Sequence, residues 1–374
     1  ASFKINFGQQ GFAHQPSSFT DLLNSQNLDD PAIVLPKKYF DIFLYDATGN
    51  AMSFSGLDFQ PDWIWQKSRN STVSSNVNYL IDANRGGNLG LVGNSGNAEY
   101  SGAAITFTSN GYNMGASSGG QGNASGNSYV SWNWFAGGST VTNNNGSISS
   151  QVRASTTSGV SIVTYTGNGQ DAATVGHGLG VAPQIVLVKR RNASDDWRMN
   201  VGPILASGKE GHSLKWNSAG GENDANNLFN STNPSSTVFT LGSSPDADVN
   251  SNGSTYVAYC FAAVEGFSSF GRYMGNGATN GRVIFTGFKP AWVMIKTTQQ
   301  AGDWVIIDST RSATNPRNKR LDANASDAEQ TEIIHDFLAN GFKLRSSSAS
   351  KNPNSEIQVY WAFAEAPFKY ARAS

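Results

Sequence analysis

The sequence contains a single cysteine, Cys260, and only four histidines among its 374 residues. One thiol rules out an internal disulfide and a thiolate metal cluster. The histidines, His14, His177, His212 and His335, follow none of the spacings that are typical of metal sites. We therefore expect no disulfide and no cofactor.

Charged residues are also scarce. They make up 14% of the chain, and 26 Lys and Arg against 27 Asp and Glu leave a net charge of −1. A nucleic-acid partner requires a basic face, so we expect none. No apolar run is long enough to cross a bilayer, and we expect no membrane insertion.

Aromatic residues and turn-forming residues are abundant instead. Aromatic side chains form 11% of the chain, including nine Trp and 21 Phe, which is too many for a disordered protein. The 40 glycines, together with frequent Asn, Ser and Thr, indicate many turns. This composition predicts a turn-rich all-β protein.

One stretch occurs three times, at residues 59–67, 181–189 and 288–296. Each copy has a proline, a short apolar run, and a lysine six positions after the proline. Proline suits the entry of a strand, because its φ is fixed and it cannot donate a ladder hydrogen bond. The run is short for a helix, so each copy predicts a strand whose lysine returns to water.

The copies share their flanks, with a Gly-Asn turn before each one and an aromatic strand ending in Phe-Ala after it. A repeat of roughly 100 residues is the size of a domain. We predict three tandem β-sandwich-like modules with short helices, at residues 39–137, 149–263 and 264–374. Residues 1–38 are predicted to form an extended docking arm. Residues 138–148 are predicted to form a linker that lets the first two modules move somewhat independently.

One helix is predicted within the third module. Ser326 can cap it, with Glu329 as the capping-box partner. Residues 333–338 supply an apolar face at helical spacing, and Asn340-Gly341 can end the helix. Laid over a sheet, such a helix would bury apolar area that the strands leave open.

A calcium loop is the one metal site that the sequence suggests. Asp246, Asp248, Asn250 and Asn252 alternate like oxygen ligands. A helical calcium loop needs a glutamate six residues after its glycine, where Tyr259 stands instead. A polar hairpin loop without metal is the alternative.

Tryptophan side chains are candidates for sugar binding, because an exposed ring can stack on a sugar. Trp197 and Trp304 each follow a lysine-ended strand in an Asp-Trp pair, and Trp216 is a third candidate. We predict that these three bind carbohydrate if their rings are exposed.

No catalytic residue is predicted. A glycosidase needs two carboxyl groups across a cleft, and we identify no acid that recurs in all three copies. An Asp-Arg pair recurs in modules one and three only, which favours a structural ion pair. These pairs and their counterparts in module two are Asp82 with Arg85, Asp308 with Arg311, and Asn200 with Pro203.

Four motifs stand out together in the repeats: a Tyr-Thr-Gly-Asn-Gly turn at residues 165–169, a Gly-Phe-Lys-Pro strand at 287–296, a Gly-Phe-Lys-Leu strand at 341–344 and a closing strand at 256–262. With these motifs, residues 39–370 resemble the tandem β-repeat region of virion fibre proteins of marine and freshwater tailed phages. The opening residues 5–10 are similar to the last strand of SPRY-like lectin modules.

The resemblance implies a location on the surface of a virion, without catalytic residues. We expect a non-enzymatic tail or capsid fibre that displays β modules for attachment to a host-surface glycan or protein. The resemblance further implies a homotrimer, and the N-terminal arm is expected to bind other virion proteins. A carbohydrate-binding lectin-like module and a capsid decoration protein are alternatives, followed by a polysaccharide-degrading enzyme.

Overall fold

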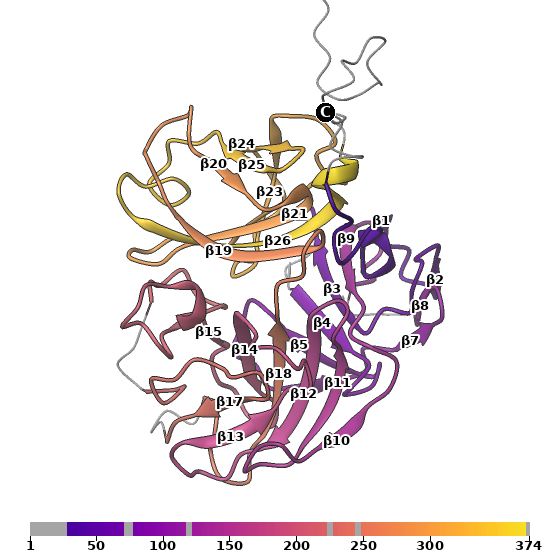
Figure 1. Ribbon diagram of the computed structural model, residues 1–374. Coiled ribbons are helices and arrows are strands. Elements are labelled where there is room, and N and C mark those ends of the chain that lie inside the picture. The colour runs from indigo at the N-terminus through magenta and orange to yellow at the C-terminus, as the bar shows by residue number, and fades with distance from the viewer. Residues whose placement is uncertain (1–27, 71–77, 117–121, 223–226, 244–247, 372–374) are drawn as a thin grey trace, which may run out of the picture.

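The structure is a computed structural model that describes residues 28–70, 78–116, 122–222, 227–243 and 248–371. Within these residues the chain forms strands β1 to β26 and three short 3-10 helices, so the prediction of an all-β fold is confirmed. Figure 1 shows three groups of strands arranged around a common centre. Among the described residues, no helix has the length and hydropathy of a transmembrane span.

Module one follows the first 3-10 helix and packs two antiparallel sheets face to face. Its large sheet has the order β1-β9-β3-β4-β5-β6, and its small sheet has the order β2-β8-β7. Phe54, Ile64 and Tyr112 belong to the core between them. The elements are η1 (Pro36–Lys38), β1 (Phe40–Asp46), β2 (Met52–Ser55), β3 (Trp63–Ser68), β4 (Asn78–Asp82), β5 (Leu89–Val92), β6 (Tyr100–Ser101), β7 (Ile105–Thr108), β8 (Gly111–Met114) and β9 (Ser128–Trp134).

Module two repeats this plan with two further strands at one edge. Its large sheet has the order β10-β11-β12-β18-β14-β15-β16, and the pair β13-β17 covers one face. Val163, Val186 and Phe239 lie in the core between the layers. The elements are β10 (Val141–Asn143), β11 (Ser150–Ser155), β12 (Val160–Thr166), β13 (Ala173–Gly176), β14 (Ile185–Arg190), β15 (Arg198–Asn200), η2 (Gly202–Ile204), β16 (Ser213–Lys215), β17 (Val238–Leu241) and β18 (Thr255–Phe261).

Module three forms one continuous sheet that folds back over itself. Its order is β19-β26-β21-β22-β23-β24-β25-β20. Val293 of β21 and Phe342 of β25 share one core cluster, so the two ends of the sheet face each other. The elements are β19 (Ser268–Met274), β20 (Val283–Phe285), β21 (Phe288–Thr297), β22 (Val305–Asp308), β23 (Arg317–Asp322), β24 (Gln330–Leu338), β25 (Gly341–Leu344), β26 (Ile357–Pro367) and η3 (Phe368–Tyr370).

The predicted helix of module three is wrong, because β24 occupies its place as a strand paired with β23 and β25. Neighbouring strands satisfy its backbone, and β-branched Ile333 and Ile334 suit a sheet, which overrides the local helical spacing. Glu329 does not close a capping box. Its main-chain N–H donates to the carbonyl of Arg69, which belongs to module one.

The three large sheets turn one face inward and share a single core. Ring contacts join every pair of modules. The ring centroids are 5.6 Å apart for Trp63 and Phe261, 6.1 Å for Trp134 and Trp292, and 6.2 Å for Phe261 and Phe363. The modules therefore form a closed ring with approximate threefold symmetry. This contradicts the expectation that modules one and two move independently.

The predicted linker also belongs to the ring. Val141 to Asn143 form β10, and Ile148 is buried and bridges to Val175 of β13. Of the predicted arm, residues 1–27 lie outside the described residues. Ile33 is buried, with its N–H donating to the carbonyl of Glu265.

A recurring asparagine holds the Gly-Asn turn of each module. Its side-chain oxygen accepts a hydrogen bond from the main chain of the turn, and its side-chain amide donates to a main-chain carbonyl in or just after the turn. The three bonds are Gly49 N to Asn123 (3.2 Å), Asn168 N to Asn250 (3.0 Å) and Asn276 N to Asn352 (2.9 Å).

Replacing Asn352 with alanine should destabilise the protein by roughly 2 kcal/mol, because several buried groups lose their partner at once. The Asn352 amide donates to the side chain of Asn276 and to the carbonyls of Ala278 and Ser346. Urea denaturation measures the loss. The matched control is Asn354→Ala on the exposed side of the same loop, which should change stability by less than about 0.5 kcal/mol. Equal effects of the two substitutions would contradict the assignment.

Candidate binding site at a module junction

The lysine that ends each repeated strand crosses to the neighbouring module. Its ammonium group donates to a backbone carbonyl there, and module one reaches module three, two reaches one, and three reaches two. The contacts are Lys67 to Ala325 O (2.8 Å), Lys189 to Gly96 O (3.2 Å) and Lys296 to Ala219 O (3.1 Å). All three residues are buried, so the prediction that they return to water is wrong. Burial lowers the pKa of each to about 8.

These pKa values predict that the protein becomes more stable as the pH rises from 8 to 10. The pKa of an unfolded lysine is about 10.4. Below pH 8 both states carry the proton, so the cost of burying the charge is fully present. Above pH 8 only the unfolded state keeps it, and stability rises by roughly 1 kcal/mol per pH unit for each lysine.

Urea denaturation between pH 7 and 9.5 tests this expectation. Lys67→Met should remove about one third of the rise, because three lysines contribute. A free energy of unfolding that stays flat or falls over this range in the unaltered protein would contradict it.

A glutamate that was not predicted from the sequence also recurs at every junction. The main-chain N–H of this glutamate donates to a carbonyl of the neighbouring module, on the residue two positions after that module's lysine. The three bonds are Glu99 to Arg191 O (2.8 Å), Glu222 to Thr298 O (2.7 Å) and Glu329 to Arg69 O (2.8 Å). The Arg191 guanidinium donates two hydrogen bonds to the Glu99 carboxylate, and the Arg69 guanidinium donates two to the Glu329 carboxylate. At the third junction Thr298 takes the place of the arginine, and Glu222 pairs instead with Lys209 of its own module. The three glutamates stand 32, 33 and 33 positions after the lysine of their own module, so this nearly constant spacing is the sequence signal that could have found them.

The Asp-Arg pairs are structural, as predicted, and each receives a donor from the next module. The side chains of Asp82 and Arg85 are fully buried and 2.6 Å apart, and the Tyr259 hydroxyl donates to Asp82 at 2.7 Å. Asp308 and Arg311 repeat the pair at 2.5 Å, and there the indole of Trp132 is the donor at 3.1 Å. Trp132 and Tyr259 hold equivalent positions, opposite Trp65 and Leu187.

Module two has apolar residues where the pair would stand. Asn200 lies opposite Val186, so Val201 and Ile204 are the true counterparts, one position beyond those predicted. Both are buried in the shared core. The donor that would face them is Trp361, whose indole N–H has no hydrogen-bond partner among the described residues.

The three tryptophans predicted to bind sugars are buried. Trp197 and Trp216 are 0% exposed and Trp304 is 1% exposed, so none can stack on a ligand. Instead, the Trp197 indole donates to Val92 O at 2.9 Å, and the Trp304 indole donates to Lys215 O at 3.1 Å. Both side chains therefore close a module junction.

The predicted calcium ligands that the structure describes, Asp248, Asn250 and Asn252, do not converge. Asp246 lies outside the described residues, and Asn252 is exposed. The Asp248 carboxylate pairs with the Arg198 guanidinium at 2.5 Å, so its charge is already matched. Asn250 points to the Gly-Asn turn. The described residues hold no group of three His, Cys, Asp or Glu suited to a metal ion.

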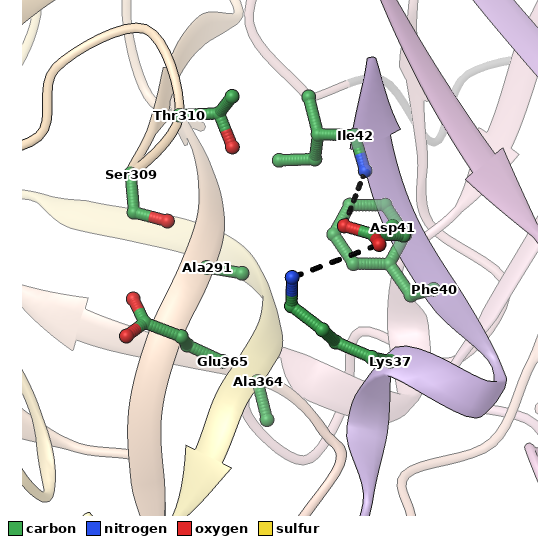
Figure 2. A pocket seen from close by; sticks show the side chains of 9 residues that line it. All are labelled: Lys37, Phe40, Asp41, Ile42, Ala291, Ser309, Thr310, Ala364 and Glu365. Carbon is green, nitrogen blue, oxygen red and sulfur yellow. Dashed lines mark hydrogen bonds and ion pairs between the residues drawn. The ribbon is translucent and has the colours of Figure 1, made fainter. Parts of the chain in front are cut away.

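A cavity of about 170 Å³ lies between modules one and three. Figure 2 shows Lys37 and Asp41 on the module-one side, with Ser309, Thr310 and Glu365 on the module-three side. Phe40, Ile42, Ala291 and Ala364 complete the lining.

Both carboxylates of this cavity already have partners. Asp41 accepts a hydrogen bond from the N–H of Ile42 at 2.8 Å and lies 3.8 Å from the Lys37 ammonium. Burial raises the pKa of Asp41. Glu365 pairs with Lys289 at 3.1 Å. Because Lys37 is mostly exposed and its contact is long, an incoming cation can replace it at small cost.

No cavity residue was predicted from the sequence. The cavity arises from what one junction lacks relative to the others, and a repeat pattern reveals only what the copies share. Comparing the copies in three dimensions supplies the missing signal.

The geometry defines a class of protein, namely three β-sandwich-like modules closed into a ring within one chain. The chain belongs to the family described as domain of unknown function (DUF7483), whose match covers residues 35–367. That span ends with β26, so the family comprises the whole ring and not a single module. No curated protein and no solved structure matches the chain.

Proposed function

We propose that this chain is a non-enzymatic structural protein of a phage virion, a tail or capsid fibre that displays its β modules for attachment to a host surface. The resemblance of the repeats to phage fibre proteins motivates the proposal. The closed ring supports it, because the ionic groups at the junctions join modules into a rigid body suited to display.

The observation that carries the proposal is where the two ends of the described chain lie. Asp30 accepts a hydrogen bond from the Lys369 ammonium at 2.7 Å and another from the Tyr370 hydroxyl. In Figure 1, η3 is the yellow coil at this end of the molecule. Attachment to a particle through residues near both ends would leave the opposite side of the ring facing outward.

The resemblance to phage fibre proteins also suggests the partners. Residues of the N-terminal arm would bind other virion proteins, and the chain would assemble as a homotrimer with the outward modules contacting a host glycan or protein. The ring already buries three module faces within one chain, so trimer contacts would form between whole rings.

Gold-labelled antibodies against the purified protein, applied to intact particles under the electron microscope, test the proposal. We expect labelling at the tail or the capsid surface, and we expect the purified protein to compete with particles for adsorption to host cells. Particles that carry no label, together with unchanged adsorption at saturating protein, would contradict it.

A further inference from the structure

The edge of the large sheet differs between modules one and two. β1 and β12 are equivalent strands, because Ile42 lies opposite Trp132 and Ile162 lies opposite Tyr259. In module two, β11 pairs with β12 in antiparallel register, and Arg153 lies opposite Ile162. Among the described residues, no strand pairs with β1 on that side, so β1 is an open edge.

At the junction of modules one and two, β11 is held by side chains of module one. The Asn84 amide donates to Gln151 O at 3.0 Å and to Ile162 O at 3.2 Å. The Arg153 guanidinium pairs with the buried Asp62 carboxylate at 2.6 Å. This junction therefore shows what an added strand with one basic residue looks like when it is bound.

The cavity between modules three and one occupies the same place. Ser309 N donates to Ala291 O as Ala83 N donates to Asp62 O, so Ala291 is the counterpart of Asp62. Thr310 is then the counterpart of Asn84, with an exposed side chain beside the open edge. The space that Arg153 and Asp62 fill in one junction is empty of protein atoms in the other.

Negative charge is still present at this place, on different residues. Glu365 is the counterpart of Ala136, whose main-chain N–H donates to Asp62. The main chain of Glu365 therefore lies beside the position that corresponds to Asp62, and its side chain brings a carboxylate there. Asp41 adds a second carboxylate. The N–H of Ile42, which has no neighbouring strand to bond, donates to that carboxylate. At the junction of modules two and three, η2 packs against β19, the strand equivalent to β1.

We propose that the edge of β1 and this cavity form a docking slot for an extended segment of a partner protein. The segment adds antiparallel to β1, as β11 adds to β12, and places one arginine or lysine between Asp41 and Glu365. Strand addition at an open edge is a common mode of peptide recognition, and the main chain supplies much of its affinity. The slot stands on the geometry alone. That the partner is another virion protein rests on the proposed function.

The chain provides its own probe, a synthetic peptide with the sequence of residues 148–157, which contains β11 and Arg153. Labelled with a fluorophore, it should bind the full chain with a saturable rise in anisotropy. A matched peptide with glutamine in place of the arginine should bind about tenfold more weakly or worse, because the charge-assisted contact is lost. Glu365→Gln should weaken the arginine peptide to a similar extent, whereas Glu210→Gln, an exposed acid of module two, should not.

Hydrogen exchange locates the bound peptide. Addition of a strand should slow exchange at the N–H groups of Ile42 and Leu44 and leave β6, the opposite edge of the same sheet, unchanged. Equal binding of the arginine and glutamine peptides, or no protection at Ile42 and Leu44, would overturn the proposal. The peptide comparison needs no altered protein, so it holds even if a variant fails to fold.

Two further outcomes would overturn the choice of partner. Binding that appears only after removal of residues 1–27 would assign the slot to the chain's own N-terminal segment. Self-association that Glu365→Gln abolishes would assign it to a second copy. Peptide binding as expected, with particles that carry no label, would support the slot and refute the proposed function.

Discussion

Replacing Trp134 with alanine is expected to lower the free energy of unfolding by about 3–5 kcal/mol, because the substitution leaves a large cavity in a core that cannot collapse. The indole is fully buried. Its ring centroid lies 4.5 Å from that of Trp63 in the same module, and 5.6 Å and 6.1 Å from those of Phe363 and Trp292 in module three. The loss should therefore appear in modules one and three together.

Urea denaturation gives the size of this loss, and hydrogen exchange shows which strands share it. The control is Phe285→Ala, since that ring is 72% exposed at the edge strand β20. It should change stability by less than about 0.5 kcal/mol. A loss confined to the strands of module one would show that the cores are separate.

The second large effect is expected at the buried pair of Asp82 and Arg85. Asp82→Val should cost about 3–5 kcal/mol, because it leaves the guanidinium buried without its main partner. Glu99 still contacts Arg85 at 2.8 Å, which places the loss toward the lower end. The double substitution Asp82→Val with Arg85→Ile copies the apolar pair of module two and should recover at least half of the loss.

A double-mutant cycle measured by chemical denaturation tests this expectation. The coupling energy between the two substitutions should reach about 2 kcal/mol. Each single substitution leaves a buried charge without its partner, whereas the double substitution removes both charges. The double variant leaves the Tyr259 hydroxyl without its acceptor, as Trp361 already lacks one in the native ring. Additive losses would mean that the pair is not the energetic unit that its geometry indicates.

The strands and the repeats could be predicted from the sequence, because the signal for each is local. A proline near the start of a strand, a short apolar run and a Gly-Asn turn are each read from a few neighbouring residues, and all three recur in every module. The helix prediction failed for the same reason. Residues 330–338 carry a helical spacing locally, but their backbone is paired with two strands that lie elsewhere in the chain.

The ring could not be predicted, because it depends on contacts between modules. A lysine at the end of a strand usually returns to water, but here each one finds a carbonyl of another module. The burial of Trp197 and Trp304 likewise depends on contacts with a neighbouring module, which the residues beside them in the sequence do not reveal. The cavity beside Glu365 is hidden still further, because it results from a strand that module one does not have.

The three modules share one aromatic core and should therefore unfold as one cooperative unit. Differential scanning calorimetry of the whole chain tests it most directly. We expect a single transition whose calorimetric and van't Hoff enthalpies agree, as for an all-or-none unit. Two or three resolved transitions, or a van't Hoff enthalpy near one third of the calorimetric value, would show that the modules unfold separately and would contradict it.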